Sequence, residues 1–350
     1  MSAFYSGFRR LFACLIGLVF FLSGMLKIID PVGTTLIVRE YLKLFNLTFL
    51  MGLDKPIAIA LSLLEALVGA ALLAGVWSKI VAFITMAMMA FFTLITVFLL
   101  VKNPEMDCGC FGEAIHLTHF QSFLKNVVLC VFCIPAFLPF KHMQPPRNSR
   151  YVGFGIAALV VLAACVYSNR NLPLIDFTPF APGNDIFNQF GNSDPDAPVL
   201  SFKDDYGDYY DEYATFGKVL MVSAYEPEKL TDADWVDFFH FMNEAYKNNS
   251  NMMVLLSGEN TDAALIELKP NTFLTDYRTA VALNHSNAGV TYLKDGMVVA
   301  KWPKGKVPSG DELAAILSQD PDEYMLRTRF RGRLKFQVAV IGSLAVLLLL

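Results

Sequence analysis

Two cysteines lie one residue apart in the segment Pro104-Glu-Met-Asp-Cys-Gly-Cys-Phe-Gly112, which is flanked by strongly apolar stretches. Cys108 and Cys110 can join only through a short, strained ring, and strain makes a disulfide easier to reduce. The intervening Gly109 relieves the backbone of such a ring. The pair therefore predicts thiol–disulfide exchange. Two alternatives stay open: the thiols fill space in a packed loop, or they form one fixed structural bridge.

A second pair, Cys130 and Cys133, lies in the sequence Cys-Val-Phe-Cys of a later apolar stretch. At the spacing i, i+3 the two thiols share one face of a helix, so we include them among the candidate catalytic residues. Cys130 lies about 10 Å into the predicted helix, where a thiol forms its reactive thiolate poorly. Packing is the alternative role for this pair, and the favoured role for the isolated Cys14 and Cys165.

Glu65 and Lys27 are ionisable residues inside long apolar stretches. A charge at membrane depth is costly unless it is paired, which makes Glu65 a functional candidate and Lys27 its plausible partner. Two roles are open for them. They form a structural ion pair between two helices, or they bind a cofactor such as a quinone or hold a proton. We treat both as candidate cofactor-binding residues.

Two histidines follow the first cysteine pair, and together they give the pattern C-x-C-x5-H-x2-H at Cys108, Cys110, His116 and His119. The ligand types and their number suit a tetrahedral zinc site, but the spacing of one residue between the cysteines is unusual for one. Histidines at a membrane interface are the simpler interpretation, so we predict no metal site.

The composition is that of a membrane protein. Of 350 residues, 55% are hydrophobic and only 17% are charged, against about 25% charged in soluble domains. The net charge of -4 shows no excess of basic residues of the kind that binds nucleic acid. Stretches near the 20 residues needed to cross a bilayer occur at residues 11–29, 57–77, 80–101, 123–140 and, shorter, 152–166. Small residues predicted to let these helices approach closely are Ser23, Gly24, Gly69 and Gly75.

Residues 170–325 have a different character, with frequent Asp, Asn, Gly and Pro and with alternating apolar patterns. Buried strands are predicted at 218–225 (KVLMVSAY) and 251–258 (NMMVLLSG), an amphipathic helix at Asp232–Lys247, a short helix at 261–268, and a hairpin turning at Asp295-Gly296. The aromatic residues of Asp232–Lys247 are expected to be core residues. Ser309 is predicted to cap the domain's last helix.

The expected fold class is therefore an α-helical membrane bundle of about five to six spans plus an α/β soluble domain. The domains are predicted as a four-helix bundle at 1–150, a fifth span at 151–169, a soluble domain at 170–325 and a short last span at 336–350. The basic residues Arg9, Arg10, Lys141, Arg147 and Arg150 favour a cytoplasmic N-terminus, with the cysteine loop and the soluble domain outside. The basic run Arg327, Arg329, Arg331, Arg333 and Lys335 argues against that placement.

The membrane half resembles the DoxX/MauE group of four-helix membrane proteins over residues 8–140. The resemblance is carried by "RRLFACLIGLVFFLSGMLKIIDP", "LLEALVGAALLAGVW" and, most specifically, "DCGCFG" followed by "LKNVVL". It implies a link to disulfide maturation of periplasmic proteins or to quinone metabolism. The layout is also similar to vitamin K epoxide reductase, a thiol–quinone enzyme, so a quinone is the cofactor that this likeness implies.

The soluble half looks like a thioredoxin fold of the TlpA type, from "DDYGDYYDEYATFGKVLMVSAYEP" onward. The family's CxxC motif is replaced by Glu226-Pro227-Glu228-Lys229, and Ala288-Gly289-Val290 stands at its cis-proline position. No cysteine follows Cys165, so this domain is expected to bind a partner rather than to exchange thiols.

We therefore expect a protein of the bacterial cytoplasmic membrane that supports disulfide or electron transfer at the outer face, through Cys108 and Cys110. The expected partners are membrane lipid and a periplasmic redox or client protein, with no nucleic acid. A thiol/quinone oxidoreductase is the enzymatic form of this hypothesis. The alternative is a scaffold without catalysis, whose thioredoxin-like domain binds a partner protein.

Overall fold

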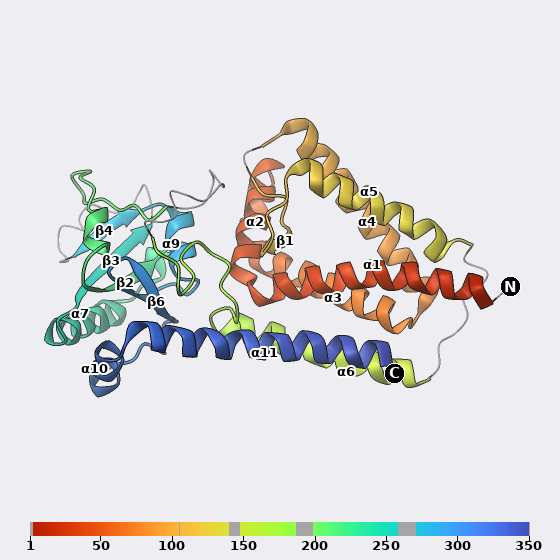
Figure 1. The fold of residues 1–350 in the computed structure, drawn as a ribbon. Coiled ribbons are helices and arrows are strands. Elements are labelled where there is room, and N and C mark those ends of the chain that lie inside the picture. The colour runs from red at the N-terminus through yellow and green to blue at the C-terminus, as the bar shows by residue number, and fades with distance from the viewer. Residues whose placement is uncertain (1–2, 105, 140–147, 187–198, 258–270, 350) are drawn as a thin grey trace. The chain divides into compact units, whose positions relative to one another are not determined.

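The computed structural model describes residues 3–104, 106–139, 148–186, 199–257 and 271–349. The chain divides into two units, one formed by residues 1–170 with 334–350 and the other by residues 171–333. The first is a helical bundle and the second is built around a mixed sheet (Figure 1). The predicted fold class, a membrane bundle plus an α/β soluble domain, is confirmed.

The membrane unit contains helices α1 (Ala3–Ile29), α2 (Pro31–Leu44), α3 (Asp54–Ala74), α4 (Ser78–Lys102), α5 (His119–Phe137) and α6 (Asn148–Arg170), the 3-10 turn η1 (Thr48–Leu53) and the short strand β1 (Cys110–Glu113). Within the described residues, five helical segments are long and apolar enough to cross a membrane: Ser6–Ile29, Thr48–Ala74, Ser78–Lys102, His119–Phe137 and Asn148–Arg170. Each coincides with one of the five longer apolar stretches of the sequence.

Helix α2 was not predicted, although its start carries a recognisable signal. Asp30 caps it by accepting a hydrogen bond from Gly33 N at 2.9 Å, and Pro31 occupies the first helical position, where no N–H is needed. The helix packs beside β1 and α3 (Figure 1). Its consequence for the site is that a helix, polar in part, supports the cysteine segment.

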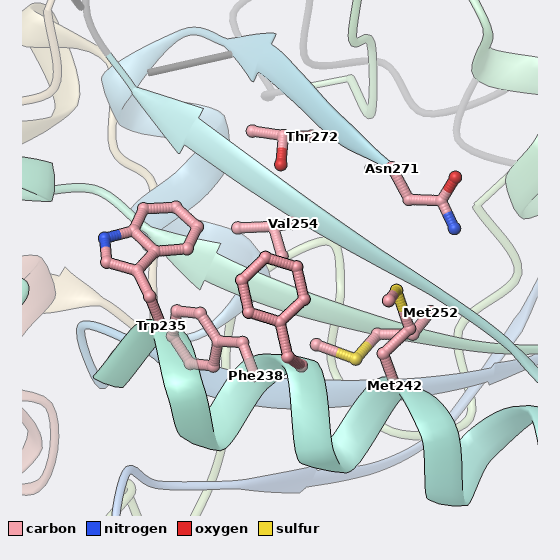
Figure 2. Close-up of a pocket in the computed structure, with 8 residues that line it drawn as sticks. Trp235, Phe238, Met242, Met252, Val254, Asn271 and Thr272 are labelled. Carbon is pink, nitrogen blue, oxygen red and sulfur yellow. The ribbon is translucent and has the colours of Figure 1, made fainter. Parts of the chain in front are cut away.

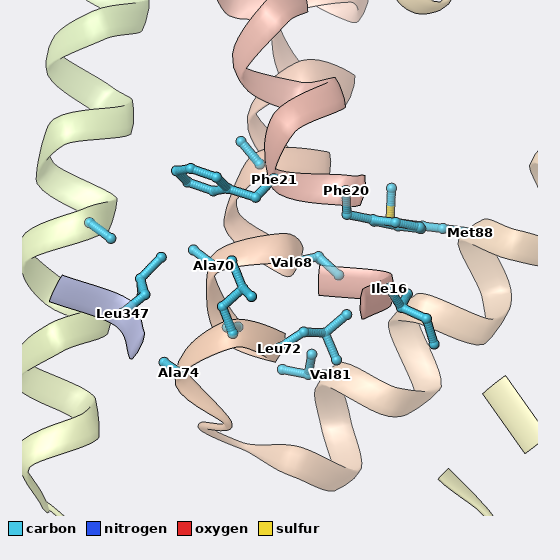
Figure 3. Packing of buried hydrophobic residues seen from close by; sticks show 14 of the residues in the cluster. Ile16, Phe20, Phe21, Val68, Ala70, Leu72, Ala74, Val81, Met88 and Leu347 are labelled. Carbon is cyan, nitrogen blue, oxygen red and sulfur yellow. The ribbon is translucent and has the colours of Figure 1, made fainter. Parts of the chain in front are cut away.

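Helices α1 and α3 approach each other at glycines. A Cβ on Gly24 would lie 2.7 Å from Ala66 Cα, and one on Gly69 would lie 2.7 Å from Phe21 Cα. The predicted close packing is therefore confirmed at these two positions. Ser23 and Gly75 have other roles. Ser23 donates a hydrogen bond to the backbone of the cysteine segment, and Gly75 ends α3 with the left-handed φ of 74°. Around this contact lies an apolar core that includes Phe20, Val68 and Met88 (Figure 3).

Arg9 and Arg10 bind the ends of other helices. The buried guanidinium of Arg9 donates to Ala136 O at 3.3 Å and to Phe137 O at 3.1 Å, at the end of α5. Arg10 donates to Leu72 O at 2.7 Å and also to Leu73 O, in the last turn of α3. Carbonyls at a helix C-terminus lack intrahelical partners and attract positive charge. The two arginines therefore fasten one end of the bundle.

The soluble unit contains β2 (Lys218–Ala224), β3 (Asn251–Ser257), β4 (Thr272–Thr275), β5 (Gly289–Lys294) and β6 (Met297–Trp302) in the described order β4-β3-β2-β5-β6. Strands β2, β3 and β4 run parallel, and β5 and β6 add as antiparallel strands. Helices α7 (Asp232–Lys247), α9 (Tyr277–Leu283) and α10 (Gly310–Ser318) and the turns η4 (Asp211–Ala214) and η5 (Pro227–Lys229) complete the unit. α11 (Pro321–Leu349) runs from this unit into the first.

The β5–β6 turn and the start of α10 are two places where the sequence predicted local structure in this unit. The hairpin turn is confirmed, with φ values of 49° at Asp295 and 81° at Gly296. Ser309 occupies the cap position of α10, but its side chain makes no cap bond, and Gly310 N instead donates to Glu244 Oε2 at 3.0 Å. The predicted helix at 261–268 lies outside the described residues, as do Lys141 and Arg147.

Candidate functional site

The cysteine segment lies between the end of α4 and the start of α5. Asn103 ends α4 in the left-handed conformation, with φ of 44°. α5 begins with a capping box, in which Thr118 Oγ1 accepts from Gln121 N at 3.2 Å and Gln121 Oε1 accepts from Thr118 N at 3.0 Å. Both ends of the segment are thus fixed by local hydrogen bonds, and β1 lies between them.

The two thiols of the segment are in contact. Cys108 Sγ and Cys110 Sγ lie 3.0 Å apart, as free thiols. Gly109 makes this contact possible because its φ is +65°, a conformation that side chains disfavour, and a Cβ there would lie 2.5 Å from Ile37 Cγ2. The sequence prediction that glycine relieves the backbone here is confirmed. The pair is close enough for a small movement to bring the sulfurs to bonding distance.

Two side chains from other helices hold the backbone of the pair. Tyr41 of α2 donates its hydroxyl to Cys108 O at 2.8 Å, and Ser23 of α1 donates to Cys110 O at 2.5 Å. Burial raises the pKa of Tyr41, with a further contribution from the cysteines, so its hydroxyl remains a donor. Sequence analysis missed Tyr41 because the helix that carries it was not predicted.

The pair is electrostatically unequal. A hydrogen bond from the Cys108 thiol, assisted by Lys125 and Lys27, lowers the pKa of Cys110 to about 5 against the opposing effect of burial. The same hydrogen bond, together with burial, raises the pKa of Cys108 well above its usual range. A thiolate is the form that attacks a disulfide, so Cys110 is the more reactive sulfur at neutral pH.

Lys27 and Glu65 form the ion pair that the sequence predicted. Lys27 Nζ lies 2.6 Å from Glu65 Oε2, and the two side chains are only 7% and 6% exposed. The ammonium also lies 5.9 Å from the ring centre of Phe92. β1 passes close by, because a Cβ on Gly112 would be 3.5 Å from Lys27 Cγ. The ion pair therefore lies directly next to the strand that carries Cys110.

The structure does not bring Cys130 and Cys133 to the first pair. Both lie on α5, and Cys130 is 11 residues after the helix start, which corresponds to about 16 Å along the axis. Cys130 Sγ lies 3.5 Å from Thr93 Oγ1 of α4, and Cys133 is buried in the apolar core. A direct exchange between the two pairs has no support in this arrangement.

The two histidines near the pair have hydrogen-bond partners of their own. His116 Nδ1 lies 2.9 Å from Asp107 Oδ2, and His119 Nε2 lies 3.0 Å from Met106 O. Within the described residues, no group of three or more His, Cys, Asp and Glu side chains is arranged to hold a metal ion.

Comparison with known families points to the same part of the chain. Residues 6–139 match the family model described as methylamine utilisation protein MauE. The match contains α1 to α5, the cysteine segment and the Lys27–Glu65 pair, and it supports a MauE-like membrane domain. The searches of curated proteins and of solved structures find no match to the chain.

Lys125 and Ser122 are two polar residues of the MauE-like unit that sequence analysis did not single out. Both lie on α5, three residues apart and therefore on one face. Lys125 Nζ lies 5.0 Å from the ring centre of Phe111, the residue after Cys110, and Ser122 is fully buried beside Cys108. Their spacing of three residues, 12 and 15 residues after Cys110, is the signal that was available in the sequence.

Outside the MauE-like unit, the soluble unit has a small pocket between α7 and strands β3 and β4 (Figure 2). It is lined by Trp235, Phe238, Phe239, Met242, Met252, Val254, Asn271 and Thr272. The expectation that the aromatic residues of α7 are core residues is therefore only partly right. Phe241 is buried, whereas Phe239 is 38% exposed and its neighbour Val236 is 65% exposed.

Proposed function

We propose that the MauE-like unit exchanges disulfides with a client protein through Cys108 and Cys110. The single observation that carries this proposal is the 3.0 Å contact between two free thiols across a glycine. In the proposed reaction, a client dithiol gives two electrons and two protons to the Cys108–Cys110 disulfide. The client becomes a disulfide and the pair becomes two sulfhydryl groups.

A lipid quinone is the proposed acceptor that returns the pair to its disulfide form. The reduced pair would lose two electrons and two protons, and the quinone would become a quinol. The buried ion pair leaves Glu65 and Lys27 little exposed surface, which favours a role in joining α1 to α3 over direct binding of the quinone. The acceptor site is therefore proposed at the cysteine segment itself.

The proposed location is the cytoplasmic membrane of a bacterium, with the N-terminus inside and the cysteine segment and soluble unit in the periplasm. Arg9, Arg10 and Arg150 support this orientation because they lie in the first turns of α1 and α6, at helix ends on the side opposite to the cysteine segment. The basic residues at the start of the apolar part of α11 argue in the other direction.

Trapping the thiols in intact cells tests the proposed reaction. A maleimide of defined mass, unable to cross the inner membrane, is added after cells are supplied with or depleted of quinone. We expect Cys108 and Cys110 to be labelled in depleted cells and protected when quinone is supplied. Cys108→Ser and Cys110→Ser should each reduce client oxidation to the background rate, whereas Cys14→Ser should leave it unchanged. A pair whose labelling never responds to quinone or client would disprove the proposal.

The soluble unit is proposed to be a thioredoxin-like module that binds without exchanging thiols. The order β4-β3-β2-β5-β6, with a parallel centre and an antiparallel edge hairpin, supports this assignment. The segment at Glu226 replaces the family's cysteines and is bonded to Asn287, whose Oδ1 accepts from Glu226 N at 3.1 Å. With no thiol in this unit, binding is the function that remains for it.

A second candidate function, a partner-binding scaffold, is favoured by the pocket on α7 and the exposed apolar side chains beside it. A photo-reactive residue at Val236 should cross-link to one discrete partner in cells, and Trp235→Ala should weaken that cross-link several-fold. The same photo-reactive residue at the exposed Gln319 is the matched control. Cross-links of equal strength at both positions, or one unaffected by Trp235→Ala, would argue against this surface.

A further inference from the structure

The two thiols of the pair differ in how far a client can reach them. Cys108 is only 8% exposed, and it lies on the inner side of the turn against α2 and α5. Cys110 is more accessible and begins β1. A client disulfide or thiol therefore meets Cys110 first.

The two cysteines also differ in the side chains of α5 that lie beside them. Ser122, a neutral hydroxyl, lies beside Cys108. Lys125, one turn further along α5, places its ammonium over the ring of Phe111, next to Cys110. Its positive charge is only partly exposed, so solvent screens it less than a surface lysine.

We propose that Cys110 forms the mixed disulfide with the client, that Cys108 is the thiol released when that bond forms, and that Lys125 stabilises the Cys110 thiolate. This inference rests on the proposed exchange function. In the first step a client thiolate bonds to Cys110 Sγ and the Cys108–Cys110 bond breaks, so that Cys108 leaves and takes a proton. In the second step the other client thiol loses its proton and attacks the client sulfur. Cys110 then leaves as a thiolate, and two electrons have reached the pair.

The charged groups around Cys110 agree with this assignment. The thiol of Cys108 donates to it, Lys125 approaches from α5, Lys27 adds positive charge from α1, and the protonated Tyr41 lies on α2. The result is the lowered pKa described above, beside a Cys108 that keeps its proton. A low pKa makes Cys110 the better leaving group of the second step.

The inference is tested by the pH dependence of alkylation in the full chain in detergent. Iodoacetamide modification of residue 110 is followed by peptide mass in a Cys108→Ser background, where a hydroxyl replaces the donor. We expect the apparent pKa to rise by about one unit in Lys125→Met, because a nearby positive charge is lost. Alkylation at pH 5 should then fall roughly fivefold. Lys125→Arg should restore the original profile, and Lys102→Met is the control for an exposed lysine nearby.

Two results would overturn the inference. One is an unchanged pH profile in Lys125→Met, and the other is faster alkylation of Cys108 in Cys110→Ser than of Cys110 in Cys108→Ser. Size-exclusion profiles show whether each variant is folded. If Lys125→Met does not fold, the pH profile of Lys125→Arg still tests the inference. The quinone-dependent trapping described above is a separate readout. A pair that responds to quinone with no effect of Lys125 would refute only the inference. The reverse result would refute the proposed function, on which the inference rests, and would leave only the effect of Lys125 on Cys110.

Discussion

Replacing Lys27 with methionine is expected to destabilise the membrane unit by about 3–5 kcal/mol, because it leaves the buried Glu65 carboxylate without its partner. The two groups are 2.6 Å apart, and neither side chain is more than 7% exposed. The lone carboxylate must become neutral or open the contact between α1 and α3. Unfolding in detergent, followed by circular dichroism as denaturant is added, measures the loss.

The double variant Lys27→Met with Glu65→Leu is the matched control for this experiment. It removes both charges and should recover most of the lost stability, since an apolar pair of similar volume often replaces a buried ion pair without cost. The client exchange rate of the recovered protein then separates two roles. Unchanged exchange assigns the ion pair to structure, whereas lost exchange in a stable protein gives it a part in the redox reaction. A single variant as stable as the wild type would contradict the whole argument.

Replacing Gly69 with valine is also expected to lower the stability of the membrane unit by a large amount. A Cβ at this position would meet the backbone of Phe21, which cannot move like a flexible side chain, so α1 and α3 must separate. Overpacking of a core lowers stability by about 1–3 kcal/mol. A clash with the backbone should cost an amount at the upper end of this range or above it. We expect little folded protein in size-exclusion profiles and a large drop in the unfolding midpoint.

Gly155→Val provides the control for the glycine experiment. Gly155 also lies in a candidate span, on α6, but a Cβ there meets nothing within 4 Å. Its substitution should leave the unfolding midpoint nearly unchanged. If both valine variants behave alike, the membrane context rather than the helix contact sets the cost, and the argument for close packing at Gly69 fails.

The sequence predicted the parts of this fold that depend on long or local patterns. Apolar length located the five candidate spans, and the Asp295-Gly296 dipeptide located a hairpin turn, because each signal is contained within its own segment. α2 escaped prediction because it is short and polar in part, lies between two spans, and owes its place to packing. Its start at Asp30-Pro31 was visible in the sequence, but the end of the neighbouring apolar stretch obscured it.

The candidate site divides in the same way. The thiol pair and the Lys27–Glu65 pair were predicted because scarce or costly residue types draw attention wherever they occur. The roles of Tyr41 and Lys125 were not predicted. Polar residues of these common types acquire a role only when folding brings them beside the cysteines. The exposed edges of α7 were likewise invisible, because an aromatic residue on a helix looks the same in a core and around a pocket.

The bonds of Arg9 tie the order of synthesis to the order of assembly. The carbonyls of Ala136, Phe137 and Pro139, which accept from this residue, lie 127, 128 and 130 positions further along the chain. The ribosome therefore releases the first span long before its arginine can find these partners. Until α5 arrives, Arg9 must rely on water or lipid headgroups, and the bundle stays open at that end. The fourth span to be made therefore supplies the hydrogen-bond partners of an arginine in the first.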